Sequence, residues 1–110
     1  MPFVNTDDLE IKEPLPGWSG RFFHSEHLTF GYYETVAGAA LHEHEHPNEE
    51  IWQVIEGELE VSIGGRVERA GPGCVAIIPP NTLHWVKVVT SGRVIVTDYP
   101  RRDAIGQIKT

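Results

Sequence analysis

Polar and apolar residues alternate along most of this chain, and apolar positions at helical spacing are nearly absent. The clearest case is LEVSI, where Leu59, Val61 and Ile63 share one face and the positions between them are polar. A period of two is typical of a strand with one buried face and one wet face. The pattern therefore predicts a protein built from β-strands.

Similar segments recur at short intervals between turn residues. The predicted strands are residues 27–36, 41–46, 51–55, 59–63, 66–70, 74–78, 83–89 and 93–99. Gly64-Gly65 is the strongest hairpin signal, and we also expect a tight turn at Glu56-Gly57 and a last hairpin around Ser91-Gly92. About eight or nine short strands predict an all-β sandwich or barrel, and the pattern alone leaves an immunoglobulin-like sandwich and a jelly roll both open.

The length and the N-terminal composition predict one domain with an arm. A chain of 110 residues has room for a single core. Its first segment is polar and interrupted by prolines. We expect residues 1–24 to form an N-terminal arm that packs on the barrel or on a dimer partner, and residues 25–110 to form the barrel. Because exposed sheet edges need covering, we expect a homodimer.

Charge, the length of apolar runs and cysteine content indicate which partners and which cellular compartment to expect. The formal net charge of −7 repels phosphate backbones, so we expect no nucleic-acid partner. The longest apolar run, CVAII, is far too short for a membrane span. The single Cys74 cannot form an internal disulfide, and the first residues lack the pattern of a secretory signal. These features predict a soluble cytoplasmic protein.

The stretch HEHEHPNEE, residues 42–50, contains three histidines and four glutamates. Alternate residues of a strand lie roughly 6.5–7 Å apart on one face, so two imidazoles can share an ion. Three in a row span about 13 Å, so we expect one ligating pair and one bystander. Further ligands must come from other strands, and the candidates are Glu49 or Glu50 and the distant His84.

The ligand types indicate a divalent transition metal. Imidazole and carboxylate suit Fe(II), Mn(II), Ni(II), Co(II) or Zn(II). Four protein ligands around an ion that prefers six leave two positions for water or substrate, which favours catalysis over a structural role.

The spacing around this stretch resembles the first motif of the cupin family, G-x5-H-x-H-x3,4-E-x6-G. The matching residues are Gly38, His44, His46, Glu50 and Gly57. This register selects Glu50 over Glu49 and His44 with His46 as the pair. The resemblance implies a single jelly-roll β-barrel with one metal in its mouth.

The second cupin motif, G-x5-P-x-G-x2-H-x3-N, is also similar. Gly73, Pro79 and His84 match it, whereas Asn81 stands for the second glycine and Val88 for the final asparagine. Asparagine tolerates the left-handed backbone that glycine would adopt, so the first departure is mild. The resemblance therefore implies four metal ligands. They are His44, His46, Glu50 and His84.

Among cupins, the chain is most similar to small single-domain members, including those that handle unsaturated uronates in pectin breakdown. It shares with them the IGG hairpin and the YPRRD tail, residues 99–103. Many of those relatives carry Gln in place of Glu50, and an Asp and an aromatic residue just before the Pro-Arg-Arg, where this chain has Val96, Thr97 and Asp98. The match therefore implies the single-domain group and not one reaction.

Residues beside the four ligands are candidates for the cavity. Trp52 and Val54 share the face of Glu50, so we expect both to line the cavity. His42 lies on the cavity face one pleat from the ligating pair, as a supporting group, a substrate-binding group or an exposed bystander near the rim. Arg102, with Arg101, either clamps a substrate anion or belongs to a solvated, salt-bridged tail. Asp98 is a general base only if it points inward.

We expect a metal-dependent enzyme that acts on a small organic ligand. Family breadth favours a dioxygenase acting on a carbonyl, enol or phenolic substrate. The alternatives are a metal-dependent isomerase or lyase of a sugar acid and a non-catalytic cupin that binds a small metabolite.

Overall fold

The computed structural model describes residues 3–103 of the chain. These form a short 3₁₀ turn, η1 (Thr6–Asp8), and eight strands. The strands are β1 (Lys12–Leu15), β2 (Trp18–His24), β3 (Thr29–Thr35), β4 (Ala40–His44), β5 (Glu49–Ile63), β6 (Arg66–Ala70), β7 (Val75–Ile78) and β8 (His84–Tyr99). The prediction of an all-β fold is confirmed. Within the described part of the chain, no helix is long and apolar enough to cross a membrane.

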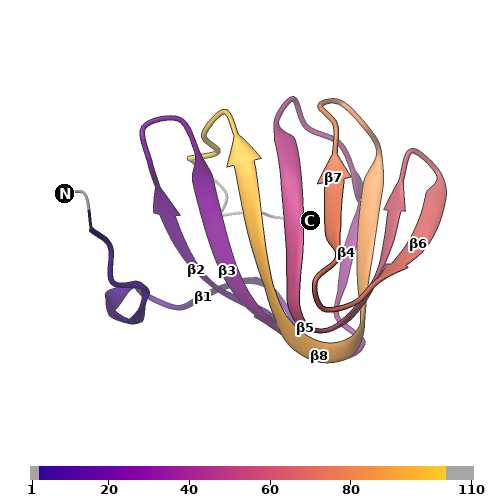
Figure 1. Cartoon of the computed structure of the whole chain (residues 1–110), viewed down its shortest axis with the longest axis horizontal. Helices are drawn as coiled ribbons and strands as arrows, with labels where there is room; N and C mark the ends of the chain where they lie inside the picture. The colour runs from indigo at the N-terminus through magenta and orange to yellow at the C-terminus, as the bar shows by residue number, and fades with distance from the viewer. Residues whose placement is uncertain (1–2, 104–110) are drawn as a thin grey trace.

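Two long strands organise the barrel, and all strand pairs are antiparallel (Figure 1). β5 has 15 residues and β8 has 16. The first half of β5 pairs with the second half of β8 in a sheet that also contains β1, β2, β3 and β7. The second half of β5 pairs with the first half of β8, between β4 and β6. The two halves curve into one jelly-roll barrel.

The predicted turn at Glu56-Gly57 and the predicted hairpin at Ser91-Gly92 are wrong, because β5 and β8 each continue through these points. The two strands bend together, with register shifts between Val54 and Leu59. Gly57 takes a φ of +81°, and Gly92 has no side chain where the neighbouring strand crosses. Since both strands bend at one place, their pairing is kept on either side.

The core lies between the two curved halves. It contains Trp18, Tyr33 and Trp52 together with a set of aliphatic residues on alternate positions of β5 and β8. Trp18 meets Tyr33 and Trp52 edge to face, with ring centroids 5.8 Å and 5.7 Å apart. β1 and β2, from the segment expected to be an arm, belong to the sheet, and Trp18 of β2 is one of the core residues.

Candidate metal centre

Three strands and one loop bring the predicted ligands to one end of the barrel. His44 ends β4, His46 follows in the loop, Glu50 lies in β5 and His84 begins β8. His44 and His84 are direct cross-strand partners. One ring nitrogen from each histidine lies within 4.8 Å of the other two. The Glu50 carboxylate lies 3.6 Å from His46 Nε2 and 3.5 Å from His84 Nε2.

The backbone fixes how the three imidazoles present their nitrogens. Each Nδ1 lies within hydrogen-bond distance of a carbonyl oxygen two residues away, so in the neutral ring Nδ1–H donates and Nε2 keeps its lone pair. The pairs are His44 with His42 (2.8 Å), His46 with Asn48 (3.1 Å) and His84 with Thr82 (2.8 Å). The Nε2 atoms of His46 and His84 are buried and have no hydrogen-bond partner among the described residues. Converging, unpartnered lone pairs are what a transition metal requires, so the residues fit such an ion.

Glu50 is held as a buried carboxylate, 2% exposed. Trp52 Nε1–H donates to its Oε1 at 2.7 Å, and Arg102 donates to its Oε2 at 3.1 Å. Burial opposes its charge, but the surrounding donors, first His46 and His84, hold the pKa of Glu50 well below its usual value. Although burial also disfavours a charged imidazole, the adjacent Glu50 raises the pKa of His84. The carboxylate therefore stays ionised, ready to balance a cation.

Asp98 is a member of the site that the sequence left undecided. It lies in β8 opposite Glu50, is fully buried, and neither of its oxygens has a hydrogen-bond partner in the part of the chain that the structure describes. Arg102 Nη1 is 3.6 Å from its Oδ1. Burial first, and then the neighbouring Glu50 carboxylate, raise the pKa of Asp98 to about 9. Val94, Val96 and Asp98 are two residues apart on β8, so they share one face of the strand, and all three are buried. The apolar residues at 94 and 96 are therefore the sequence signal that would have placed Asp98 inward.

Arg102 points into the site and is only partly exposed, whereas Arg101 bonds to the exposed Asp103 at the surface. Of the two alternatives for this pair, the structure therefore places Arg102 beside the ligands and Arg101 in a solvated ion pair.

The structure places His42 outside the cavity. A register shift between Leu41 and His44 interrupts the strict alternation, so both of these residues line the interior. The His42 ring is exposed, with its centroid 5.3 Å from that of His44, and His42 borders a surface hollow together with Trp85 and Lys87. Its carbonyl oxygen still serves the centre as the acceptor for His44 Nδ1.

The cavity beside the ligands is narrow, with a free volume of about 30 Å³. Trp52 lines it as expected, with Trp18, Tyr33 and Val96 on the other walls. Val54 is not part of the lining, because it is 2% exposed and packs in the core below. The room next to the ligands is therefore suited to a small molecule.

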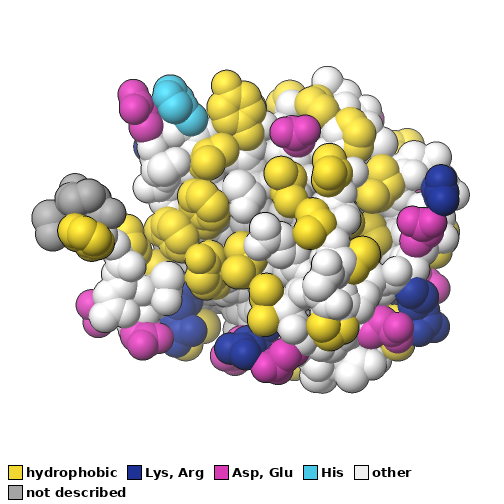
Figure 2. Space-filling model, viewed as in Figure 1, with side chains coloured by type: hydrophobic (Ala, Val, Ile, Leu, Met, Phe, Trp, Pro, Cys, Tyr) yellow, Lys and Arg dark blue, Asp and Glu magenta, His cyan; other side chains and the backbone are white. Residues whose placement is uncertain are grey.

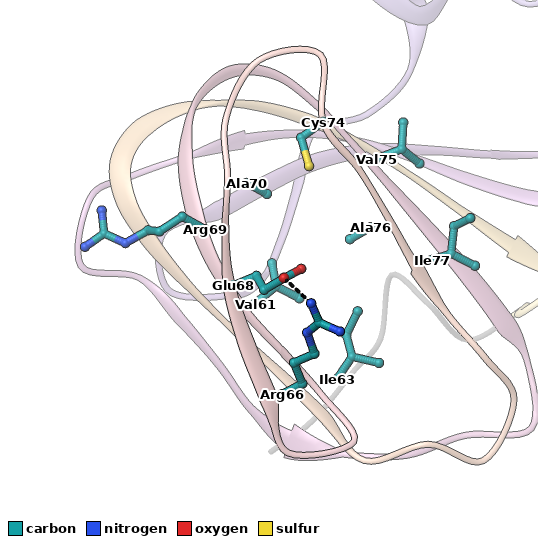
Figure 3. Close-up of a pocket in the computed structure, with 10 residues that line it drawn as sticks. All are labelled: Val61, Ile63, Arg66, Glu68, Arg69, Ala70, Cys74, Val75, Ala76 and Ile77. Atoms are coloured by element: carbon teal, nitrogen blue, oxygen red, sulfur yellow. Dashed lines mark hydrogen bonds and ion pairs between the residues drawn. The ribbon is translucent and has the colours of Figure 1, made fainter.

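A larger groove of about 420 Å³ lies elsewhere, where β6 and β7 diverge (Figure 3). Val61 and Ala70 are among its lining residues, and an ion pair of 2.8 Å between Arg66 and Glu68, both on β6, lies along one side. It contains none of the four predicted ligands.

Replacing Asp98 by Asn is expected to stabilise the metal-free protein at neutral and alkaline pH. Because the folded chain raises this pKa from 3.8 to about 9, the contribution of the acid to stability is complete below about pH 4 and declines as the pH rises to about 9. An asparagine side chain at this position would stay neutral throughout. Urea unfolding with a chelator measures the free energy of unfolding of both proteins. The difference between Asp98→Asn and wild type should grow in favour of the variant by up to about 4 kcal/mol from pH 5 to pH 8. Parallel stability curves for the two proteins would contradict the buried, uncharged acid.

Comparisons with known proteins agree with this geometry. A cupin domain model matches residues 31–99. An RmlC-like cupin from Shewanella frigidimarina NCIMB 400 is 24% identical, with a TM-score of 0.87 and 94% of each chain covered. KdgF from Halomonas sp. is 25% identical, with a TM-score of 0.88, over 96% of this chain and 98% of that one.

More distant folds are similar as well. Oxalate decarboxylase from Bacillus subtilis, a protein with Mn(II) centres, is 19% identical with a TM-score of 0.79, and the match covers 88% of this chain and 29% of that one. A sequence comparison with curated proteins gives no match. The domain match covers more than half of the residues, and small single-domain cupins have the same fold over nearly their whole length. This chain belongs to the cupin family.

Proposed function

We propose that this cupin is a metal-dependent enzyme that acts on a small organic acid with a carbonyl or enol group. His44, His46, Glu50 and His84 would hold one divalent transition metal. The observation that carries the proposal is the convergence of three imidazoles whose Nδ1 atoms are engaged by the backbone, beside one buried carboxylate.

The donor set limits the choice of ion. Three neutral imidazoles and one carboxylate suit Fe(II), Mn(II), Ni(II), Co(II) or Zn(II), and leave a net charge of about +1 on the centre. When bound, such an ion supplies Lewis-acid polarisation of a carbonyl or, if redox-active, reaction with dioxygen. A centre with a residual positive charge favours an anionic ligand.

Arg102 supports an acidic substrate. Its guanidinium lies near both Glu50 and Asp98, and its side chain is 18% exposed, so it can contact both the predicted ligands and a molecule that enters the cavity. A planar guanidinium binds a carboxylate through two parallel hydrogen bonds. A substrate carboxylate can take the place of the protein carboxylates as its partner. The small free volume beside the ligands limits the substrate to a few heavy atoms unless Arg102 moves.

Asp98 supports proton transfer at this site. A buried acid with a raised pKa can donate a proton at neutral pH and accept one again, which an isomerase or lyase of a sugar acid requires. This arrangement favours the isomerase or lyase reaction over a dioxygenase. The dioxygenase, which family breadth favoured, becomes the second candidate: an ion that prefers six ligands and is held by these four residues would leave two positions for substrate and dioxygen.

Oxygen consumption separates the two reactions. Protein purified without a chelator or a histidine tag is analysed for metal, and then assayed with keto acids, diketones, phenols and unsaturated uronates. Turnover of an acid without oxygen supports the isomerase or lyase. Oxygen uptake that requires the metal supports the dioxygenase. Metal and ligand binding with no turnover of any substrate would refute an enzyme and favour a non-catalytic metabolite-binding cupin.

Replacing Arg102 by Gln is expected to weaken the binding of acidic substrates. The change removes the guanidinium but keeps a polar side chain, so we expect KM or the dissociation constant to rise about 10-fold or more. Arg101→Gln is the matched control, because Arg101 bonds to Asp103 at the surface. Equal effects of the two substitutions would show that Arg102 does not contact the substrate.

A further inference from the structure

The Arg102 guanidinium reaches the predicted ligands from a stretch of chain that lies outside the sheet. β8 ends at Tyr99, and residues 100–103, here called the Arg102 segment, belong to no strand. The backbone of this segment therefore lacks the regular partners that a strand ladder gives. Arg102 nevertheless donates to Glu50 at 3.1 Å, and its side chain is only 18% exposed. Contacts other than those of the sheet must hold the segment in place.

Thr29 supplies the first of these contacts. Its hydroxyl oxygen accepts a hydrogen bond of 2.8 Å from the backbone N–H of Arg102. Thr29 is fully buried at the start of β3, where it is the cross-strand partner of Asp98. His24 Nδ1 lies 2.7 Å from the same oxygen, so the hydroxyl is engaged from two sides. Burial of a hydroxyl is costly without a hydrogen bond, and here the donor is the residue that enters the site.

The position of Thr29 in the fold explains why it can make this contact. β2 and β3 form a hairpin beside the end of β8 (Figure 1). The tip of the hairpin is open to solvent, and Figure 2 shows an acidic and a histidine side chain there. Along β3, full burial begins at Thr29, where the Arg102 segment contacts the strand.

Asn48 supplies a second contact from a different loop. Its side-chain Nδ2 donates to the Pro100 carbonyl oxygen at 2.6 Å, and the residue is 7% exposed. Its backbone carbonyl oxygen lies 3.1 Å from His46 Nδ1 and accepts the hydrogen bond of that imidazole. Asn48 therefore contacts both a predicted metal ligand and the Arg102 segment. The two contacts use different atoms, so a change of the side chain removes only the contact with Pro100.

We propose that Thr29 and Asn48 are positioning residues that hold the Arg102 guanidinium beside Glu50 and Asp98, ready to bind a substrate carboxylate. The proposal rests on the proposed role of Arg102 in binding an acidic substrate. Thr29 fixes the backbone of Arg102 itself, and Asn48 fixes the chain two residues earlier. Because a misplacement of about 1 Å is enough to impair a binding group, loss of either contact weakens the site without removing any group that touches the substrate.

The first test measures the binding of pyruvate, a small keto-acid probe, to the Co(II)-loaded protein through the visible spectrum of the ion. Thr29→Val removes the hydroxyl and keeps the shape of the side chain, so the dissociation constant should rise about 5-fold or more. Thr29→Ser keeps the hydroxyl and should bind within about 2-fold of wild type. Thr35→Val is the matched control on β3, because Thr35 is also buried and its hydroxyl has no hydrogen-bond partner among the described residues.

A double-mutant cycle shows whether Thr29 acts through Arg102. In the Arg102→Gln background, Thr29→Val should change pyruvate binding by less than about 2-fold, because the group that it positions is gone. Asn48→Ala in the otherwise wild-type protein should weaken pyruvate binding about 5-fold or more. Its Co(II) affinity should fall much less, since the backbone carbonyl that engages His46 is kept.

A second measurement requires no ligand. In metal-free protein labelled with nitrogen-15 at arginine, the side-chain resonances of Arg102 report its contact with Glu50, and Arg102→Gln assigns them. Thr29→Val and Asn48→Ala should shift and broaden these resonances. Thr35→Val should leave them unchanged.

The possible results separate this proposal from the proposed function. Arg102 resonances that stay unchanged in Thr29→Val and Asn48→Ala would overturn the positioning role. The same holds if Thr29→Val weakens pyruvate binding equally with and without Arg102, because the hydroxyl would then act by another route. If the resonances move in both variants but pyruvate binding does not depend on Arg102, the positioning role is supported and the role of Arg102 in acid binding is wrong.

Discussion

Alanine at position 84 is expected to abolish tight metal binding. His84 is fully buried, its Nδ1 is engaged by the Thr82 carbonyl, and its Nε2 faces the shared centre with no hydrogen-bond partner among the described residues. Loss of a group that only supports a ligand commonly costs about 10–100-fold in affinity, so loss of a ligand itself should cost more than about 100-fold. Competition with a chromogenic chelator measures the affinity, and elemental analysis measures the metal retained on purification.

Neighbours in the sequence provide the controls for this result. His42→Ala removes an imidazole whose ring centroid lies 5.3 Å from that of His44. The His42 ring is exposed, and only its carbonyl is hydrogen-bonded to a predicted ligand, so metal binding should fall far less than in His84→Ala. Glu50→Gln removes the buried charge and should weaken binding, whereas Glu49→Gln, on the opposite face of β5, should not. A cluster that binds metal equally well in His84→Ala and His42→Ala would be an adventitious site on the histidine tract.

Both the metal affinity and the stability of the metal-free protein are expected to depend on pH. The raised pKa of His84 means that a proton competes with the ion at its Nε2. Metal affinity should therefore fall as the pH is lowered through the titration of this imidazole. Asp98 contributes in the opposite way, because its uncharged form stabilises the metal-free fold at low pH. The Asp98→Asn variant separates the two effects, because it removes the titration of Asp98 and keeps that of His84.

The convergence of the proposed ligands could largely be predicted because these residues lie at fixed spacing along the chain. The alternation of β5 decides that Glu50 points inward and Glu49 outward, and the buried and exposed positions follow this rule. The assignment of His84 depends on a second motif far along the chain, and the structure makes this residue the cross-strand partner of His44.

The remaining features depend on contacts between distant segments. The displacement of His42 results from a register shift against β8, which no local pattern in the histidine tract reveals. Arg102 follows the last strand, and only the fold brings its guanidinium back to Glu50. Glycine marks a change of direction at Gly57 and Gly92, but whether the chain reverses or bends depends on the partner strand. Both strands bend here because each has a glycine beside the other.

Replacing Gly92 by Ala is therefore expected to destabilise the fold severely, by at least about 4 kcal/mol. A Cβ on Gly92 would overlap the Glu56 carbonyl group and lie 2.7 Å from the Gly57 nitrogen, and these are backbone atoms that cannot rotate away. Gly71→Ala is the matched control, because a Cβ there meets no atom within 4 Å, so its stability should change by less than about 1 kcal/mol. Neither glycine has a positive φ, so the comparison isolates the steric contact between β5 and β8. Urea unfolding of both variants measures the difference, and equal midpoints would mean that the two strands can separate at the bend without loss of the barrel.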